Sequence, residues 1–255
     1  MTIGRIITSD ADVAEGAAWL AQAEPRFATA LQATGPLPLR LRADGFDALI
    51  GAIISQQVSV ASANAMRAKM DAAGLTHEAA IIAAGEEGLR DAGLSRQKIR
   101  YALALADAGI DYVALRDAPN TDVIKTLTAI PGVGTWTAQI YAMFSLGRAD
   151  VFAEGDLALQ EAAKSLFDLP ERPKPKQLAI MAEDWSPWRS VAARALFRTT
   201  GWQSNARGSH DTCIECRTPR AGVGGNALSG GVPAWLRGQW RRFVGFGRSF
   251  GGTPA

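Results

Sequence analysis

The sequence contains few of the residues that build disulfide frameworks, metal centres or membrane spans. Its 255 residues include only two cysteines and two histidines, which is too few for a disulfide scaffold and fits a reducing compartment. No apolar run reaches the roughly 18 residues of a membrane helix, and no basic segment followed by an apolar core opens the chain. We therefore expect an intracellular, cytoplasmic protein that does not contact a membrane.

The main part of the chain also lacks the strong positive charge that is typical of proteins that bind polyanions. The net charge is +2, but residues 203–255 hold seven arginines and two acids, whereas the first 202 residues hold 20 basic and 23 acidic groups. Composition therefore gives no support to a nucleic-acid partner. Any such role has to rest on local geometry.

Alternating runs of β-branched residues are scarce, and alanine and leucine dominate the apolar set, so we predict an all-α fold. Helical periodicity breaks at Glu24-Pro25, in the proline-flanked connector 35–42 and at Ser55-Gln56-Gln57. The expected helices cover residues 10–34 with its break, 44–54, 58–65, 77–92, a segment that follows Ser95, 111–117, 122–129, 157–167, 176–184 and 187–200. Together they predict two helical subdomains with a cleft between them.

The chain divides into three parts. We expect residues 1–43 to form a helical segment that packs on the core and residues 44–202 to form the main domain. Residues 203–255 form a tail that holds eleven of the 26 glycines and has little periodicity. We expect this tail to be disordered, and the abrupt change in composition also fits an out-of-frame ending.

A Gly-rich turn, IPGVG, lies between two apolar-periodic segments. Pro131 ends the first helix, and Gly132 and Gly134 permit positive φ angles and close approach of another backbone. The second helix then begins with exposed N–H groups, which suit one phosphate. We predict a helix-hairpin-helix whose phosphate site comprises Gly132, Val133, Gly134 and Thr137; the alternative is a plain corner between two helices.

Four blocks of sequence, residues 44–66, 94–106, 127–167 and 185–197, occur in the order that is typical of one family. In these blocks the chain resembles the helix-hairpin-helix (HhH-GPD) DNA glycosylase superfamily, most closely its 3-methyladenine DNA glycosylase II type. The resemblance implies hydrolysis of the N-glycosidic bond of alkylated purines in double-stranded DNA, as part of base excision repair. We expect the protein to act as a monomer.

The family's catalytic aspartate ends a D-x-F-x-x-x-D segment, which corresponds to Asp156 in this chain. A carboxylate there stabilises the oxocarbenium-like sugar and orients or deprotonates the attacking water. An N-alkylated purine already carries positive charge, so its departure needs little help from a general acid. Asp150 takes the earlier acidic position of the segment, and we interpret Glu154 as a solvated loop acid.

Two features that other members of the superfamily have, and that this chain lacks, indicate its type of activity. Members of the superfamily that also cut the strand carry a lysine nucleophile two residues after the second glycine, where this chain has Trp136. Members with an iron–sulfur cluster carry four cysteines after the catalytic domain, where this chain has Cys213 and Cys216, which with His210 make only half a zinc site. We predict a monofunctional hydrolase with no metal, iron–sulfur cluster or other cofactor, apart from a monovalent cation that hairpin carbonyls 129–133 could hold.

The resemblance also predicts the pocket for the damaged base. Trp136 occupies a pocket position, where its indole face would stack on an electron-poor alkylated purine. Tyr141 is one residue from a pocket tyrosine position that Ile140 holds here. Phe197 occupies the position of another pocket aromatic, although a place in the core explains it equally well.

Contacts to the duplex are expected at two other places. Gln56 and Gln57 correspond to the segment with which relatives approach the duplex, where a flipped base leaves a gap; a turn or an exposed helix end is the alternative. Lys98 belongs to a basic cluster behind the predicted N-cap Ser95, where it could meet a phosphate. We interpret Arg189 as a buried ion-pair partner or an organiser of the aspartate region.

Two other functions stay open at this point. One is an enzyme of the same fold that acts on oxidised or mismatched bases. The other is a non-catalytic helix-hairpin-helix module that only binds DNA. Asp156 distinguishes an enzyme from such a binding module, because a module that only binds DNA has no need of a carboxylate there.

Overall fold

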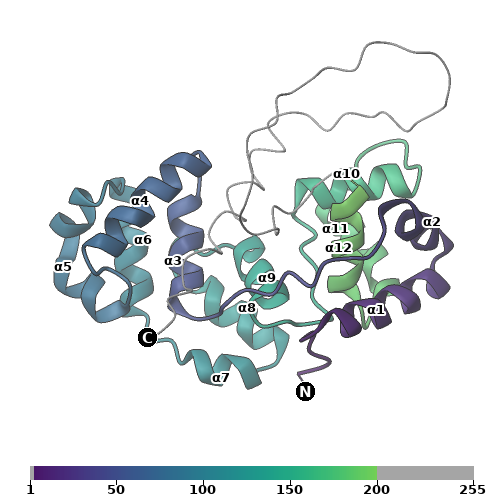
Figure 1. Cartoon of the computed structure of the whole chain (residues 1–255), viewed down its shortest axis with the longest axis horizontal. Coiled ribbons are helices and arrows are strands. Elements are labelled where there is room, and N and C mark those ends of the chain that lie inside the picture. Colours follow the sequence, from purple (N-terminus) through teal and green to yellow (C-terminus); the bar gives the residue numbers. More distant parts are fainter. Residues whose placement is uncertain (1–2, 200–255) are drawn as a thin grey trace, which may run out of the picture.

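The computed structural model describes residues 3–199, and in this range the regular elements are helices, joined by one isolated antiparallel bridge between Ile6 and Arg148 (Figure 1). The elements are α1 (Asp10–Ala23), α2 (Pro25–Thr34), α3 (Phe46–Ser55), α4 (Val60–Ala72), α5 (Glu78–Asp91), α6 (Arg96–Asp107), α7 (Tyr112–Asp117), α8 (Asn120–Thr128), α9 (Thr135–Phe144), α10 (Leu157–Leu166), α11 (Pro175–Met181), the 3₁₀ turn η1 (Ala182–Trp185) and α12 (Arg189–Thr199). The all-α prediction is confirmed for these residues. The predicted tail, 203–255, lies outside them.

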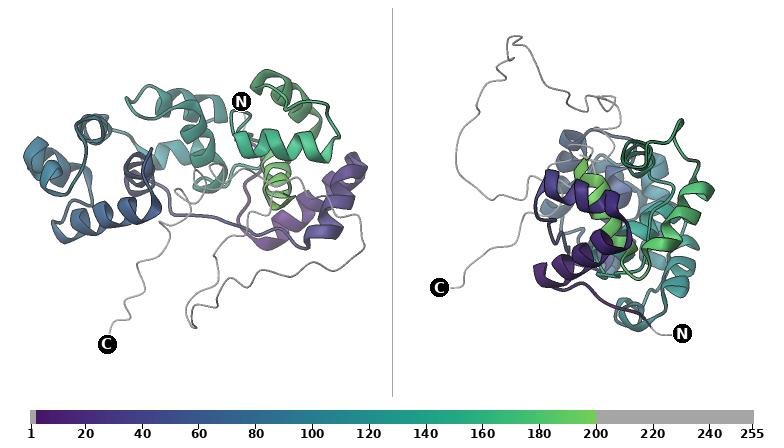
Figure 2. Two further views of the ribbon diagram at one scale, coloured as in Figure 1. Left: turned by 90° about the horizontal axis from the view of Figure 1, so that it is seen from above. Right: turned by 90° about the vertical axis from the view of Figure 1, so that its right-hand side faces the viewer.

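The helices form two groups with α7, α8 and α9 between them (Figures 1 and 2). One group contains α3 to α6, in which α6 packs on α3 and α5. The other contains α1, α2 and α10 to α12, in which α12 packs on α1, α2 and α10. The extended segment 35–45 crosses from one group to the other, and the two predicted subdomains are these groups.

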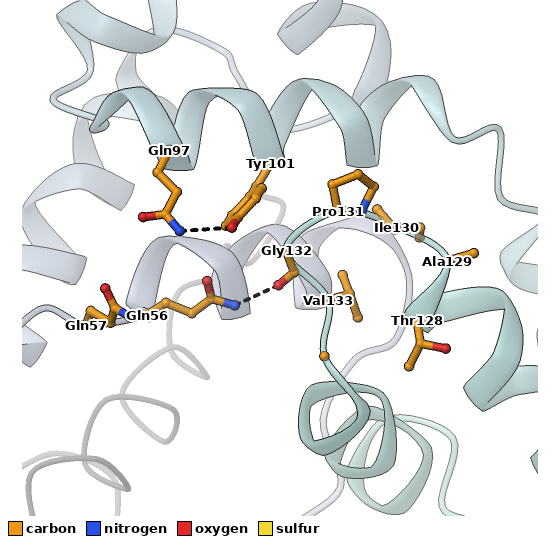
Figure 3. Close-up of a pocket in the computed structure, with 11 residues that line it drawn as sticks. Gln56, Gln57, Gln97, Tyr101, Thr128, Ala129, Ile130, Pro131, Gly132 and Val133 are labelled. Carbon is orange, nitrogen blue, oxygen red and sulfur yellow. Dashed lines mark hydrogen bonds between the residues drawn. The ribbon is translucent and has the colours of Figure 1, made fainter.

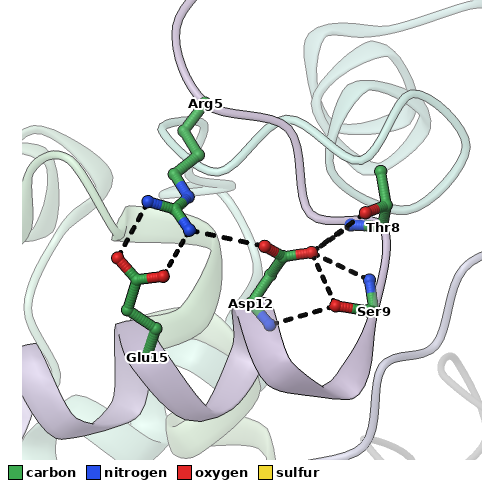
Figure 4. A network of polar contacts seen from close by, with 5 residues as sticks. All are labelled: Arg5, Thr8, Ser9, Asp12 and Glu15. Carbon is green, nitrogen blue, oxygen red and sulfur yellow. Dashed lines mark hydrogen bonds and ion pairs between the residues drawn. The ribbon is translucent and has the colours of Figure 1, made fainter.

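The first helix starts at a capping box (Figure 4). The Ser9 hydroxyl accepts a hydrogen bond from the Asp12 amide, and the Asp12 carboxylate accepts one from the Ser9 amide. Arg5 forms ion pairs with Asp12 and Glu15. Hydrogen bonds from the Thr8 amide and the neighbouring hydroxyls hold the pKa of Asp12 well below its usual range.

The N-terminal segment pairs with the chain that leads to Asp156. The Ile7 amide donates to the Gly147 carbonyl at 2.7 Å, and the Ala149 amide donates to the Arg5 carbonyl at 3.0 Å. A Cβ on Gly147 would lie 2.5 Å from the Ile7 carbonyl oxygen, so only glycine permits this approach. Residues 3–9 are therefore part of the scaffold that supports the site.

Candidate active site

The hairpin predicted from the IPGVG segment joins α8 to α9, and its two glycines have different surroundings. Gly132 has a φ of 93°, and a Cβ there would lie 2.4 Å from Cγ of Tyr101 on α6. The fold therefore requires a glycine at this position. Gly134 has a φ of −84° and nothing within 4 Å of its Cβ position, so neither its backbone conformation nor its packing requires a glycine.

The first turn of α9 has the backbone arrangement of a helix N-terminus. Its first helical hydrogen bond runs from the Ala138 amide to the Gly134 carbonyl at 3.0 Å, and no side chain caps the helix at Gly134. The amides of residues 135–137 precede that bond, as expected at a helix N-terminus. The side chains of Val133 and Thr137 are buried, so any phosphate contact at these two positions would come from the backbone.

Asp156 is a buried carboxylate held by three N–H donors. Its side chain is the N-cap of α10: Oδ1 accepts from the amides of Ala158 at 2.8 Å and Leu159 at 3.1 Å. Oδ2 accepts from Nε1 of Trp136 at 2.7 Å. Asp156 is only 3% exposed. The structure thus brings together two predicted site residues that are 20 positions apart in the sequence.

The loop before Asp156 is anchored at its start. Nε and Nη2 of Arg189 donate to the two carboxylate oxygens of Asp150 at 2.5 and 2.9 Å, and the Ser186 hydroxyl donates to the same carboxylate at 2.9 Å. The hydrogen bond with Asp150 raises the pKa of Arg189. The ion-pair interpretation of Arg189 is confirmed, although its side chain is partly exposed.

Glu154 lies in the same loop and differs from its interpretation as a solvated acid. Its carboxylate accepts a hydrogen bond from Nε2 of Gln139 on α9 at 2.8 Å. Its backbone carbonyl accepts another from Nε2 of Gln160 on α10 at 2.9 Å. The loop 150–156 is therefore tied to α9 twice, once through Glu154 and once through Asp156.

Two predicted pocket residues lie in the core. The Tyr141 hydroxyl accepts a hydrogen bond from the Gly45 amide at 2.8 Å, next to the start of α3, and burial raises the pKa of Tyr141 to about 12. Phe197 is fully buried within α12. Both side chains have a clear packing role, and their contact with a damaged base stays a prediction.

Lys98 was predicted to contact a phosphate directly, but in the structure its side chain is engaged inside the protein. Lys98 is only 7% exposed, and its Nζ donates to the carbonyls of Ile53 at 3.0 Å, Ile54 at 2.8 Å and Gln56 at 2.6 Å. These carbonyls lie at the end of α3, so the ammonium group points into the protein. By contrast, Arg96, two residues earlier at the start of α6, is exposed.

A groove with a volume of about 510 Å³ runs beside the hairpin (Figure 3). Its walls are Gln56, Gln57, Gln97, Tyr101 and residues 128–134. Nε2 of Gln56 donates to the Gly132 carbonyl at 2.9 Å, and Nε2 of Gln97 donates to the Tyr101 hydroxyl at 2.9 Å. The sequence interpretation missed Gln97 and Tyr101, although their spacing of four residues places them on one face of a helix.

Residues 3–199 contain neither a metal-binding cluster nor a helix that could span a membrane. No group of three or more histidine, cysteine, aspartate or glutamate side chains is placed to hold a metal ion in that range. None of the helices described there is both long and apolar enough to cross a bilayer. His210, Cys213 and Cys216 lie outside the described residues.

Fold and site together define a class of protein: an all-α chain in which a Gly-rich hairpin and a fixed carboxylate meet at the first turn of one helix. Residues 50–188, more than half of the chain, match the HhH-GPD superfamily base excision DNA repair proteins. The chain belongs to this family.

Individual relatives agree with this assignment. A DNA-3-methyladenine glycosidase from Bacillus halodurans is 31% identical with a TM-score of 0.65, over 71% of this chain and 86% of that one. A 3-methyladenine DNA glycosylase from Schizosaccharomyces pombe, solved with abasic DNA, is 26% identical with a TM-score of 0.63, over 73% of this chain and 97% of that one. DNA-3-methyladenine glycosylase 2 of Escherichia coli is 28% identical over 176 residues, which are 63% of this chain.

The chain matches only part of some relatives. It spans 59% of the length of the Escherichia coli protein and 41% of the length of a Bacillus subtilis relative that is 32% identical over 117 residues. The chain therefore spans less than two thirds of the length of these two relatives.

Proposed function

We propose that this protein hydrolyses the N-glycosidic bond of N-alkylated purines, of the 3-methyladenine and 7-methylguanine type, in double-stranded DNA, as the first step of base excision repair. One observation carries the proposal: the Asp156 carboxylate is a single hydrogen bond, 2.7 Å long, from Trp136 in the first turn of α9. A phosphate held by that turn would bring the adjacent sugar close to the carboxylate. The names of the relatives support the substrate class.

The chemistry follows from this arrangement. Extruding the damaged base from the stack costs a few kcal/mol and brings C1′ of its sugar next to Asp156. The bond between C1′ and the purine nitrogen then breaks, and its electron pair leaves with the base, which is already positively charged. The carboxylate stabilises the oxocarbenium-like sugar and takes a proton from the water that forms the new bond to C1′.

The same geometry favours hydrolysis without strand cleavage. Strand cleavage by this superfamily needs an amine at the position of Trp136, and here the indole of Trp136 donates a hydrogen bond to Asp156 instead. Lys98, a lysine beside the hairpin groove, is engaged by three carbonyls. Water is therefore the proposed nucleophile.

The proposed reaction uses only water and Asp156, and so requires no redox group or metal ion. A monovalent cation on hairpin carbonyls 129–133 stays a prediction, as does the monomeric state. The Gly132 carbonyl already accepts a hydrogen bond from Gln56. Contacts from Gln57, which is exposed beside the hairpin groove, to the gap left by the flipped base belong to the same proposal.

The test is to incubate the protein with methylated duplex DNA and to identify the released bases by chromatography. We expect free 3-methyladenine and 7-methylguanine, and intact strands on a denaturing gel until the abasic sites are cleaved with alkali. Parallel duplexes with oxidised or mismatched bases serve as comparisons. Release from those duplexes alone would reject the substrate class, and binding without release from any of them would reject an enzyme.

A further inference from the structure

The position of Lys98 is unfavourable for its own helix. It lies in the first turn of α6, where the helix dipole disfavours a positive charge, and burial lowers the pKa of its ammonium group to about 8. In return, the ammonium satisfies carbonyls of Ile53 and Ile54 at the C-terminal end of α3, where helix carbonyls lack helical partners. The Lys98 ammonium therefore stabilises the end of α3 and the turn that follows it.

The turn between α3 and α4, residues 56–59, is tied to the hairpin as well as to Lys98. The backbone carbonyl of Gln56 accepts from Lys98, and its side chain donates to the Gly132 carbonyl (Figure 3). Gly132 in turn lies against the Tyr101 ring on α6. The α3–α4 turn, the hairpin and α6 thus form a closed set of contacts, to which Lys98 contributes a buried positive charge.

Gln57, next to this set, has a strained backbone. Its φ is 56°, in the left-handed region, although it is not a glycine, and its side chain is exposed. Such a conformation is unfavourable for a residue with a Cβ atom and persists only where the surroundings impose it. Here the preceding residue, Gln56, is fixed at both its carbonyl and its side chain.

We propose that Lys98 is a positioning residue that holds the α3–α4 turn in register with the hairpin, so that Gln57 and the phosphate-binding turn engage the duplex together. Lys98 does not touch DNA in this arrangement. The inference rests on the proposed function, and it separates two steps of that function. Lys98 acts on extrusion of the base through Gln57, whereas Asp156 acts on the bond that breaks.

This role predicts a dependence on base pairing. Extrusion costs least when the damaged base is already unpaired, so loss of Lys98 should slow release of a paired base more than release of an unpaired one. A role in stability alone would slow both to the same degree. The ratio of the two rates therefore distinguishes positioning from general support.

The experiment uses the full chain and duplexes with one 7-methylguanine, placed opposite cytosine or opposite an abasic analogue, in single-turnover assays. Lys98→Met should lower the rate for the paired lesion about 10-fold, and the rate for the unpaired lesion less than about 3-fold. Lys98→Arg, which keeps the charge, should recover most of the difference. Lys176→Met, on α11, controls for the loss of an exposed lysine.

Arg148→Met is the matched control for stability. Arg148 is also a buried cation on backbone carbonyls, those of Leu115, Arg116 and Ala118, but it lies away from the α3–α4 turn. Its loss should lower both rates equally. An unchanged ratio in Lys98→Met, whether its rates resemble those of the wild type or of Arg148→Met, would overturn the proposal.

Amide hydrogen exchange tests the positioning role of Lys98 independently of base release. Lys98→Met should speed exchange at residues 55–58 and 132–134 at least about 10-fold more than in the rest of the described helices. Uniform exchange would overturn the positioning role even if the wild type releases alkylated bases. Conversely, a wild type that releases no base would reject the proposed function, while the exchange pattern would still test Lys98.

Discussion

The hairpin and the loop that carries Asp156 meet at one helix, α9, but they are built in opposite ways. The hairpin presents backbone N–H groups from an exposed turn with an open Gly134. The loop presents one buried side chain, fixed by three donors and anchored upstream by Arg189. A phosphate, which every nucleotide carries, can be held by backbone alone, whereas a reaction at one carbon needs a specific carboxylate in a fixed orientation.

The largest expected effect is the loss of base release when Asp156, in the loop before α10, is replaced. Asp156→Asn keeps an oxygen that can cap α10, since asparagine caps helices about as well as aspartate, but removes the charge that stabilises the sugar cation. We expect base release to fall about 1,000-fold and affinity for duplex DNA to stay within about 3-fold. Single-turnover assays and fluorescence anisotropy measure the two quantities; retained turnover would remove Asp156 from the mechanism.

The next effect sharpens the difference between the two hairpin glycines. Gly132→Ala places a methyl group at φ 93° and 2.4 Å from Tyr101, and should lower the free energy of unfolding by about 3 kcal/mol. The matched variant Gly134→Ala, with its open surroundings, should change it by less than about 1 kcal/mol. Urea denaturation of both variants measures this. Equal losses would show that Gly134 also has a structural role.

A smaller effect tests the link between the two regions. Trp136→Phe keeps an aromatic ring but removes the Nε1 donor to Asp156, and should slow base release about 30-fold, as expected for a hydrogen bond to a charged group. Gln139→Met removes the parallel hydrogen bond to Glu154 and should cost less than about 3-fold. Similar losses in both variants would mean that Trp136 only supports the loop.

The smallest effect concerns the hairpin alone. Gly134→Asp places a negative charge where the phosphate is expected, and should weaken duplex binding about 10-fold and reduce the slope of affinity against salt by about one phosphate contact. Gln32→Glu, which adds the same charge on α2, is the control. Titration at several salt concentrations measures both, and an affinity equal to that of the wild type would reject the phosphate site.

Much of the fold follows from local signals in the sequence. Ser9, Ser59 and Ser95 each cap a helix where the chain leaves an extended segment, and the apolar periodicity predicts most of the helices. The hairpin and the ion-pair role of Arg189 were also predictable, because four blocks of sequence carry a family resemblance.

The remaining details depend on contacts between elements that are far apart in the chain. Nothing near Lys98 in the sequence shows that its ammonium meets the end of α3, more than 40 residues earlier. The hydrogen bonds from Trp136 to Asp156 and from Gln139 to Glu154 likewise depend on how α9 faces the loop. For a polar residue at the start of a helix, the local sequence does not show whether the side chain is exposed to solvent or contacts a neighbouring helix.

In the proposed division of roles, the hairpin binds a DNA phosphate and Asp156 promotes cleavage of the N-glycosidic bond. The most direct test is the single-turnover rate of Gly134→Asp on a methylated duplex, measured as protein concentration is raised to saturation. We predict that half-saturation moves to about 10-fold higher protein while the plateau rate stays within about 3-fold of the wild type. A plateau that falls as far as that of Asp156→Asn would contradict the separation of binding from chemistry.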